Sequence, residues 1–172
     1  DDNVKSFTNS VPATILSADL RNPHEVEKLI SETLEVSNQL DIIVNNAALQ
    51  NVENLSEIDA DSWDAVLETN LRSIHLVMRA ALPALEKSEN ASVVNVVSIE
   101  GHQPARGHSH YSTSKAGLLM LTKSAALEYA DLGIRVNSVS PGLIDDGNLK
   151  DRWPEGIDRW LDSAPLGRVG TP

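Results

Sequence analysis

Tyr111 and Lys115 have the types and the spacing of an acid/base pair. They are four residues apart, so on a helix the phenol and the ammonium would share one face. A neighbouring cation typically lowers a phenol pKa from about 10 by roughly 1 to 3 units, which increases the fraction of reactive phenolate. The same spacing also fits a partly buried tyrosine beside a surface lysine. The pair therefore needs a second reactive group before it indicates a catalytic site.

Ser98 supplies such a group at the end of the apolar run Val93–Val97. In open α/β sheets, ligands bind beyond the carboxyl ends of the parallel strands, so a hydroxyl at this place lies where a ligand is expected. Alone, Ser98 is an ordinary strand-end serine. Tyr111 follows Ser98 by thirteen residues.

The apolar pattern predicts that a parallel sheet with helices on its faces positions these side chains. Short apolar runs alternate with longer segments of helical periodicity. The runs are 13–16, 42–44, 93–97 and 134–139. With 172 residues and 41% hydrophobic content, the chain can form one such domain. We therefore expect a single α/β domain over residues 1–172, with 143–172 as a substrate loop or lid.

Three helices are expected between these runs. The first begins at Asn22-Pro23, where asparagine can cap the helix and proline fits the first turn. The second begins between residues 59 and 61, and the third spans 111–130 and is closed by Gly133. The third is apolar around its whole circumference, so we expect one side to face the sheet and the other to meet a partner subunit.

Composition excludes several classes of protein. The chain contains 25 acidic and 14 basic residues, a net charge of −11, which disfavours binding to nucleic acid or to anionic lipid. It has no cysteine, so disulfides and thiolate nucleophiles are excluded. No apolar run is long enough to span a bilayer, and the acidic start is unlike a signal peptide. We expect a cytoplasmic protein with no nucleic-acid or membrane partner.

The segment 102–110 is polar and contains three histidines, at positions 102, 108 and 110. Its place between Ser98 and Tyr111 favours a position near the substrate, where it could prefer an anion or a polyol. The alternative, a solvated loop whose histidines bind nothing, is the interpretation that we favour from the sequence. No set of histidines and carboxylates has a metal-ligand spacing, so no metal site is predicted.

All nine glycines lie at or after Gly101, so the first hundred residues cannot contain a glycine-rich phosphate loop. The chain also begins without methionine and ends at Pro172, in what looks like a connection. We therefore expect it to be a fragment of a longer protein.

Several motifs accompany Ser98, Tyr111 and Lys115, and together they resemble those of the short-chain dehydrogenase/reductase family. Each motif is weak alone, but their order and spacing along nearly the whole chain are similar to those of the family. The additional motifs are Ala18-Asp19-Leu20, Asn45-Asn46-Ala47-Ala48, Asn70, Asn137-Ser138-Val139-Ser140-Pro141-Gly142 and Pro165-Leu166-Gly167-Arg168.

The resemblance implies hydride transfer between a nicotinamide dinucleotide, NAD or NADP, and a small carbonyl or alcohol substrate. Tyr111 would exchange a proton with the substrate oxygen, and Ser98 would hydrogen-bond the same oxygen. Lys115 would lower the phenol pKa and bind the nicotinamide ribose. Asn70 would hold a water that connects Lys115 to solvent.

The resemblance also implies where the cofactor binds. Asp19 would accept a hydrogen bond from the adenine amino group, although it could instead be only a helix cap. The other implied cofactor contacts are Leu20, Asn46, Ala47, Tyr111, Lys115, Pro141, Gly142 and Ile144. Asp146 stands where many members of the family have a threonine that bonds the carboxamide, so that contact is in doubt. The glycine-rich turn and the residue that distinguishes NAD from NADP would both precede residue 1.

The implied fold is a doubly wound, Rossmann-like parallel sheet that is incomplete in this chain. The family strand order would place missing strands between the runs at 13–16 and 42–44. The runs at 42–44, 93–97 and 134–139 should therefore be contiguous and parallel, and the run at 13–16 poorly supported. A homo-oligomer, a dimer or tetramer, is expected through helices 61–82 and 111–130.

Two alternatives remain open from the sequence. One is a dinucleotide-binding sensor or interaction domain without catalysis, since one fold serves many functions. The other is an epimerase or dehydratase, which shares the tyrosine and lysine. The intact set of Ser98, Tyr111 and Lys115 favours an enzyme over a sensor, and the motifs at Asn45 and Pro141 favour a simple dehydrogenase.

Overall fold

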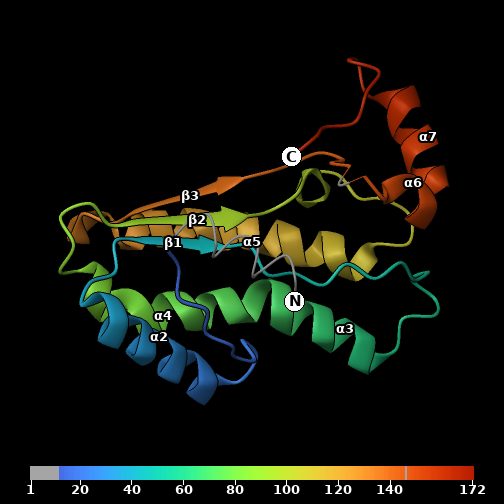
Figure 1. Ribbon diagram of the computed structural model, residues 1–172. Coiled ribbons are helices and arrows are strands. Elements are labelled where there is room, and N and C mark those ends of the chain that lie inside the picture. Colours follow the sequence, from blue (N-terminus) through green and yellow to red (C-terminus); the bar gives the residue numbers. More distant parts are fainter. Residues whose placement is uncertain (1–11, 146) are drawn as a thin grey trace.

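The chain folds around a three-stranded parallel sheet, as the computed structural model shows for residues 12–145 and 147–172 (Figure 1). The strand order is β1-β2-β3, and both neighbouring pairs are parallel. The strands are β1 (Ile42–Asn45), β2 (Ser92–Val96) and β3 (Arg135–Val139). The prediction that these three apolar runs are contiguous and parallel is therefore confirmed.

The fourth apolar run, 13–16, forms no strand. A strand requires a neighbour that pairs with its backbone groups, and the described part of the chain places none beside this run. Ile15 is accordingly 58% exposed. The expectation that this run is the poorly supported one is met, and its assignment as a strand is wrong.

The helices begin close to where their capping residues predict. Asn22 caps α2 (Pro23–Ser37) by accepting a hydrogen bond from the backbone N–H of His24. Asp59 caps α3 (Ala60–Leu67) in the same way through Ser62. α5 (Ser109–Glu128) starts two residues earlier than expected and is followed by a short 3₁₀ turn.

The predicted second helix consists of three continuous segments. After α3 the chain passes through a π-helical turn, Glu68–Arg72, and then continues as α4 (Ser73–Leu85). α4 extends two residues past Pro83, so the proline does not end the helix. π-Turns inside α-helices are rare and often mark functional sites, and this one contains the buried Asn70.

The helices pack on one face of the sheet. The core joins buried side chains of the three strands with those of α2, α4 and α5, including Ile43, Val93, Val136, Met78 and Leu118. On β1, Ile42 and Val44, which alternate with Ile43, are 61% and 60% exposed. The predicted fold class, an incomplete doubly wound, Rossmann-like α/β sheet, is therefore confirmed by the parallel strands and their flanking helices.

The oligomer stays a prediction. Two apolar side chains of α5, Met120 and Leu127, are 60% and 80% exposed, which fits a helix with a second apolar side. Within residues 12–145 and 147–172, no helix combines the length and apolar character needed to cross a membrane.

Candidate active site

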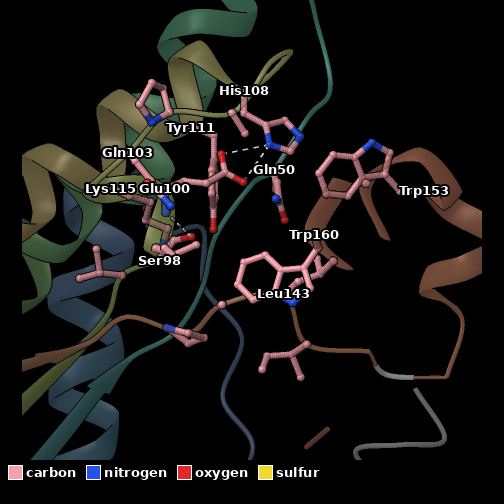
Figure 2. Close-up of a pocket in the computed structure, with 18 of the residues that line it drawn as sticks. Gln50, Ser98, Glu100, Gln103, His108, Tyr111, Lys115, Leu143, Trp153 and Trp160 are labelled. Carbon is pink, nitrogen blue, oxygen red and sulfur yellow. Dashed lines mark hydrogen bonds and ion pairs between the residues drawn. The ribbon is translucent and has the colours of Figure 1, made fainter. Parts of the chain in front are cut away.

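A cavity of about 870 Å³ opens beyond the carboxyl ends of β2 and β3 (Figure 2). Ser98, Tyr111 and Lys115 all line it. Ser98 follows β2 and caps the short 3₁₀ helix η2 (Ile99–Gly101), while α5 supplies the other two side chains from one face. The structure thus brings the hydroxyl, the phenol and the ammonium to one wall, and their catalytic roles stay predictions.

The Tyr111 phenol is surrounded by protein on most sides. Its side chain is 8% exposed, and burial raises its pKa above the ordinary value because the phenolate loses solvation. A hydrogen bond with Ser98 acts in the opposite direction, and the charge of Glu100 raises the pKa further. Lys115 is not among the groups that shift this pKa in the protein alone, and its effect on the phenol stays a prediction. The Lys115 Nζ lies 5.6 Å from the ring centroid and donates instead to the Val96 carbonyl.

Lys115 is one of the largest fully buried side chains, at 2% exposure. Its Nζ donates to the Val96 carbonyl oxygen over 2.8 Å, which leaves further ammonium protons for a ligand in the cavity. Burial lowers the pKa of this lysine from 10.5 to about 8, because the charged form is poorly solvated there.

The lowered pKa of Lys115 predicts that stability rises with pH above about 8. Between the folded pKa of about 8 and the unfolded value of 10.5, the unfolded chain binds more protons, so raising the pH stabilises the folded state. We expect the unfolding free energy to increase between about pH 8 and about pH 9.5, and Lys115→Met to flatten this increase. Urea denaturation at several pH values measures both. Lys123→Met on the same helix is the control, and an equal slope in parent and Lys115→Met would contradict the prediction.

Ser98 is held with its oxygen toward the backbone of the next turn. Its Oγ accepts a hydrogen bond of 3.1 Å from the N–H of Glu100, and the side chain is 9% exposed. Accepting this hydrogen bond uses a lone pair of Ser98 Oγ and not its hydrogen, so the hydroxyl proton stays available for donation. Donation to an oxygen that gains negative charge is the role expected of an oxyanion-stabilising group.

Asn70 is completely buried and its amide is engaged by the protein. The Oδ1 accepts from the Leu49 N–H over 2.7 Å, and Nδ2 donates to the Leu49 carbonyl over 2.8 Å and to Ser114 Oγ over 3.1 Å. The amide thereby joins the chain after β1 to α5, the helix that carries Tyr111. This contact positions the site, and the water relay through Asn70 stays a prediction.

Six of the nine predicted cofactor contacts line the cavity: Asn46, Tyr111, Lys115, Pro141, Gly142 and Ile144. The lining formed by the described residues does not include Asp19, Leu20 or Ala47. Asp146 lies outside the described residues.

Asp19 is exposed and forms a local ion pair. Its carboxylate accepts two hydrogen bonds from the Arg21 guanidinium, of 3.0 and 2.8 Å, and these hydrogen bonds lower its pKa to about 2. The alternative interpretation of Asp19 as the helix cap is wrong, because Asn22 caps α2. Its adenine contact stays a prediction.

The segment 102–110 differs from the solvated loop that we favoured. His102 is exposed, but His108 and His110 are only 1% and 0% exposed. The His108 Nδ1 lies 2.9 Å from a carboxylate oxygen of Glu100, which sequence reasoning missed. The available signal was an acidic residue two positions after Ser98 and a histidine three before Tyr111, on segments that meet at the cavity.

The segment 143–172 contains two helices, α6 (Leu149–Arg152) and α7 (Pro154–Ser163). Trp153 and Trp160 from this segment line the cavity and face Tyr111 across it (Figure 2). Gly142 packs against Trp160, and a Cβ at this position would lie 2.6 Å from the indole ring. The segment therefore borders the cavity, as a substrate loop should, and its movement as a lid stays a prediction.

The donors of the cavity are compatible with the hydroxyl groups of a ribose, since Lys115 lines it with ammonium protons that the Val96 carbonyl leaves unused. The described residues contain no group of three or more metal-ligating side chains.

The comparisons with known proteins agree with this geometry. A family described as Enoyl-(Acyl carrier protein) reductase matches residues 1–172. The chain is 35% identical over 154 residues to 3-oxoacyl-[acyl-carrier-protein] reductase FabG of Chlamydia pneumoniae, covering 86% of this chain and 59% of that relative. It is 32% identical over 166 residues to 3-oxoacyl-[acyl-carrier-protein] reductase of Synechocystis, covering 96% of this chain and 66% of the relative. The chain thus spans less than two thirds of the length of these relatives.

Solved structures show the same fold. Aldohexose dehydrogenase of Thermoplasma acidophilum superposes with a TM-score of 0.83 at 27% identity, covering 91% of this chain and 66% of that one. A short-chain alcohol dehydrogenase from Sinorhizobium meliloti superposes with a TM-score of 0.82 at 29% identity, covering 91% of this chain and 63% of that one. The chain therefore belongs to the short-chain dehydrogenase/reductase family.

Proposed function

We propose that the protein is an NAD- or NADP-dependent oxidoreductase that acts on a small carbonyl or alcohol, with Tyr111 as the acid/base. The observation that carries the proposal is the common cavity of Ser98, Tyr111 and Lys115 at the carboxyl ends of the strands. The reductases and dehydrogenases among its relatives support the same class of reaction.

Each of the three side chains has a role that its surroundings support. In carbonyl reduction, Tyr111 donates its phenolic proton to the substrate oxygen, and in alcohol oxidation the phenolate accepts it. Ser98 donates a hydrogen bond to the same oxygen and stabilises its negative charge. Lys115 binds the nicotinamide ribose hydroxyls, and its charge then assists loss of the phenol proton.

The bound nicotinamide supplies or accepts the hydride. Asn46, Lys115, Pro141 and Gly142 are the residues that would hold this end of the dinucleotide, since they line the cavity. Trp153 and Trp160 border the same space and would limit the access of water to the reacting atoms.

Removing the Ser98 hydroxyl tests this arrangement. We expect Ser98→Ala to lower kcat/KM by about 10²-fold, because one donor to the developing oxyanion is lost. The assay follows the absorbance of NADH and NADPH with a panel of ketones and aldehydes. Ser73→Ala is the matched control, since the Ser73 hydroxyl is also buried but donates to the Thr69 carbonyl. Equal rates for Ser98→Ala and Ser73→Ala would argue against the proposed site.

A further inference from the structure

The Glu100 carboxylate and the His108 imidazole form a pair in the wall of the cavity. The His108 Nδ1 lies 2.9 and 3.0 Å from the two carboxylate oxygens. Ser112 Oγ donates to the same carboxylate over 3.1 Å, so the carboxylate is fixed from a second direction. The side chains of Glu100 and His108 are 12% and 1% exposed. This pair is rigid and shielded from solvent, unlike a surface ion pair.

The other ring nitrogen of His108 has no partner among the described residues. Its Nε2 is buried without a hydrogen bond, although buried polar atoms are nearly always satisfied. A carboxylate only accepts hydrogen bonds, so Nδ1 carries the proton in the neutral imidazole, and Nε2 is then an acceptor. His110 also has a buried, unpartnered Nε2, but only His108 of these two lines the cavity.

His108 lies in the wall of the cavity between Tyr111 and Trp153. Its ring contacts the Tyr111 ring edge to face, with centroids 6.0 Å apart. On the other side its ring packs against Trp153, with centroids 5.2 Å apart. In Figure 2 the imidazole lies between Glu100 and Trp153, and Gln50 reaches into the space between Tyr111 and the two tryptophans. A substrate that fills the cavity from Tyr111 toward the tryptophans therefore passes His108 and Gln50.

The chemistry of this wall selects among substrate groups. An acceptor nitrogen needs a donor, which a hydroxyl provides and a ketone or ester oxygen does not. Directly beside the imidazole an anionic group is disfavoured, because the Glu100 carboxylate adjoins the ring. The indole rings of Trp153 and Trp160 offer apolar faces for the C–H groups of the same molecule.

We propose that His108, oriented by Glu100, binds a hydroxyl group that the substrate carries in addition to the reacting oxygen, so that the substrate is a polyhydroxylated carbonyl compound or alcohol of the sugar type. The inference rests on the proposed function, because that function places the reacting oxygen at Tyr111. His108 is a specificity-determining residue, and Glu100 is a positioning residue that acts through it.

Paired substrates that differ by one hydroxyl test this proposal. The pairs are D-glucose with 2-deoxy-D-glucose, and trans-cyclohexane-1,2-diol with cyclohexanol, each oxidised with NAD and with NADP. We expect the parent to prefer the hydroxylated member of at least one pair by about 10- to 100-fold in kcat/KM. His108→Leu should reduce this preference, measured as the ratio of the two kcat/KM values, to nearly none.

Conservative variants separate binding from folding. His108→Gln retains a polar group near the Nε2 position and should keep part of the preference. Glu100→Gln retains an acceptor for the His108 Nδ1 proton, so this variant should also keep part of the preference for the hydroxylated substrate. Glu100→Leu has no such acceptor and should lose the preference. Melting temperatures and circular dichroism identify variants that do not fold. A preference that persists in folded His108→Leu, or that survives Glu100→Leu unchanged, would overturn the proposal.

A binding measurement distinguishes failure of this inference from failure of the proposed function. Titration with D-glucose should change the intrinsic tryptophan fluorescence, since Trp153 contacts His108, and His108→Leu should abolish the change. If the protein reduces other carbonyls but prefers no hydroxylated member, this inference fails while the proposed function stands. If no hydride transfer is found, the proposed function fails. In that event, a fluorescence change that depends on His108 would still support the hydroxyl-binding site. If no such change is found, the hydroxyl-binding site is contradicted as well.

Discussion

Replacing Tyr111 with phenylalanine is expected to lower the rate of hydride transfer by about 10²- to 10⁴-fold, the typical contribution of a positioned acid/base. Phenylalanine keeps the ring that packs edge to face against His108 and lies beside the Lys115 ammonium. Only the hydroxyl, which bonds Ser98, is removed. We therefore expect a large fall in kcat with a small change in KM, because the lost interaction acts mainly in the transition state.

Tyr129→Phe provides the matched control for this substitution. Tyr129 follows the same helix, α5, but packs against the hydrophobic core and does not line the cavity. Its variant should retain the rate of the parent. Absorbance of the reduced nicotinamide measures all three proteins, and thermal denaturation shows whether each is folded. A Tyr111→Phe variant as active as Tyr129→Phe would exclude Tyr111 as the proton donor.

The pH profile of the parent should reflect the surroundings of Tyr111. Burial raises the pKa of this phenol in the protein alone, so the group is protonated at neutral pH and suited to donate a proton to a carbonyl. Oxidation needs the phenolate and should therefore increase as the pH rises. The spacing of Tyr111 and Lys115 did not reveal this direction. Sequence distance gives the shared helix face, whereas desolvation depends on what packs over the phenol.

Local sequence signals predicted the parallel sheet and the helix starts. Asn22 and Asp59 cap their helices because capping needs only a side chain that reaches its own backbone. The strands β1, β2 and β3 follow from their apolar runs. The run at 13–16 was equally apolar, but a strand also needs a paired neighbour, and that property belongs to the tertiary structure.

The three central residues of the site were predictable because their types and spacing resemble those of the short-chain dehydrogenase/reductase family. The pair of Glu100 and His108 was not, since its members are eight residues apart on different elements and meet only when η2 folds back onto the start of α5. A histidine in a polar segment is indistinguishable in sequence from a solvated one. The His108 Nε2 is buried without a hydrogen-bond partner only in the folded protein, so the sequence alone does not reveal it.

Asn95 is expected to be the polar residue on which the folded sheet depends most. It is completely buried in β2, where its Oδ1 accepts from Asn45 Nδ2 over 2.8 Å and its Nδ2 donates to Thr122 Oγ1 over 2.9 Å. Thr122 in turn donates to the Leu118 carbonyl over 2.7 Å. We expect Asn95→Ala to lower the unfolding free energy by about 2–4 kcal/mol, because it removes two hydrogen bonds and leaves buried partners unsatisfied.

The same network should affect the rate, since it connects the two elements that carry the reacting groups. Asn95 lies three residues before Ser98, and Thr122 lies two helical turns after Lys115 on α5. A displacement of about 1 Å between reacting groups can cost about 10²-fold in rate, so the folded Asn95→Ala protein should also be slower. Val94→Ala is the control, because this half-buried neighbour on β2 belongs to no such network.

A double-mutant cycle with Asn95→Ala and Thr122→Val separates this network from ordinary burial. If the two side chains act together, the double variant should lose about 1 kcal/mol less unfolding free energy than the two single losses added. Urea denaturation measures the four proteins, and the hydride-transfer assay measures their rates. Losses that add fully would show that each side chain contributes independently. The position of α5 against β2 would then depend on apolar packing, through residues such as Val93 and Leu118, and not on the amide of Asn95.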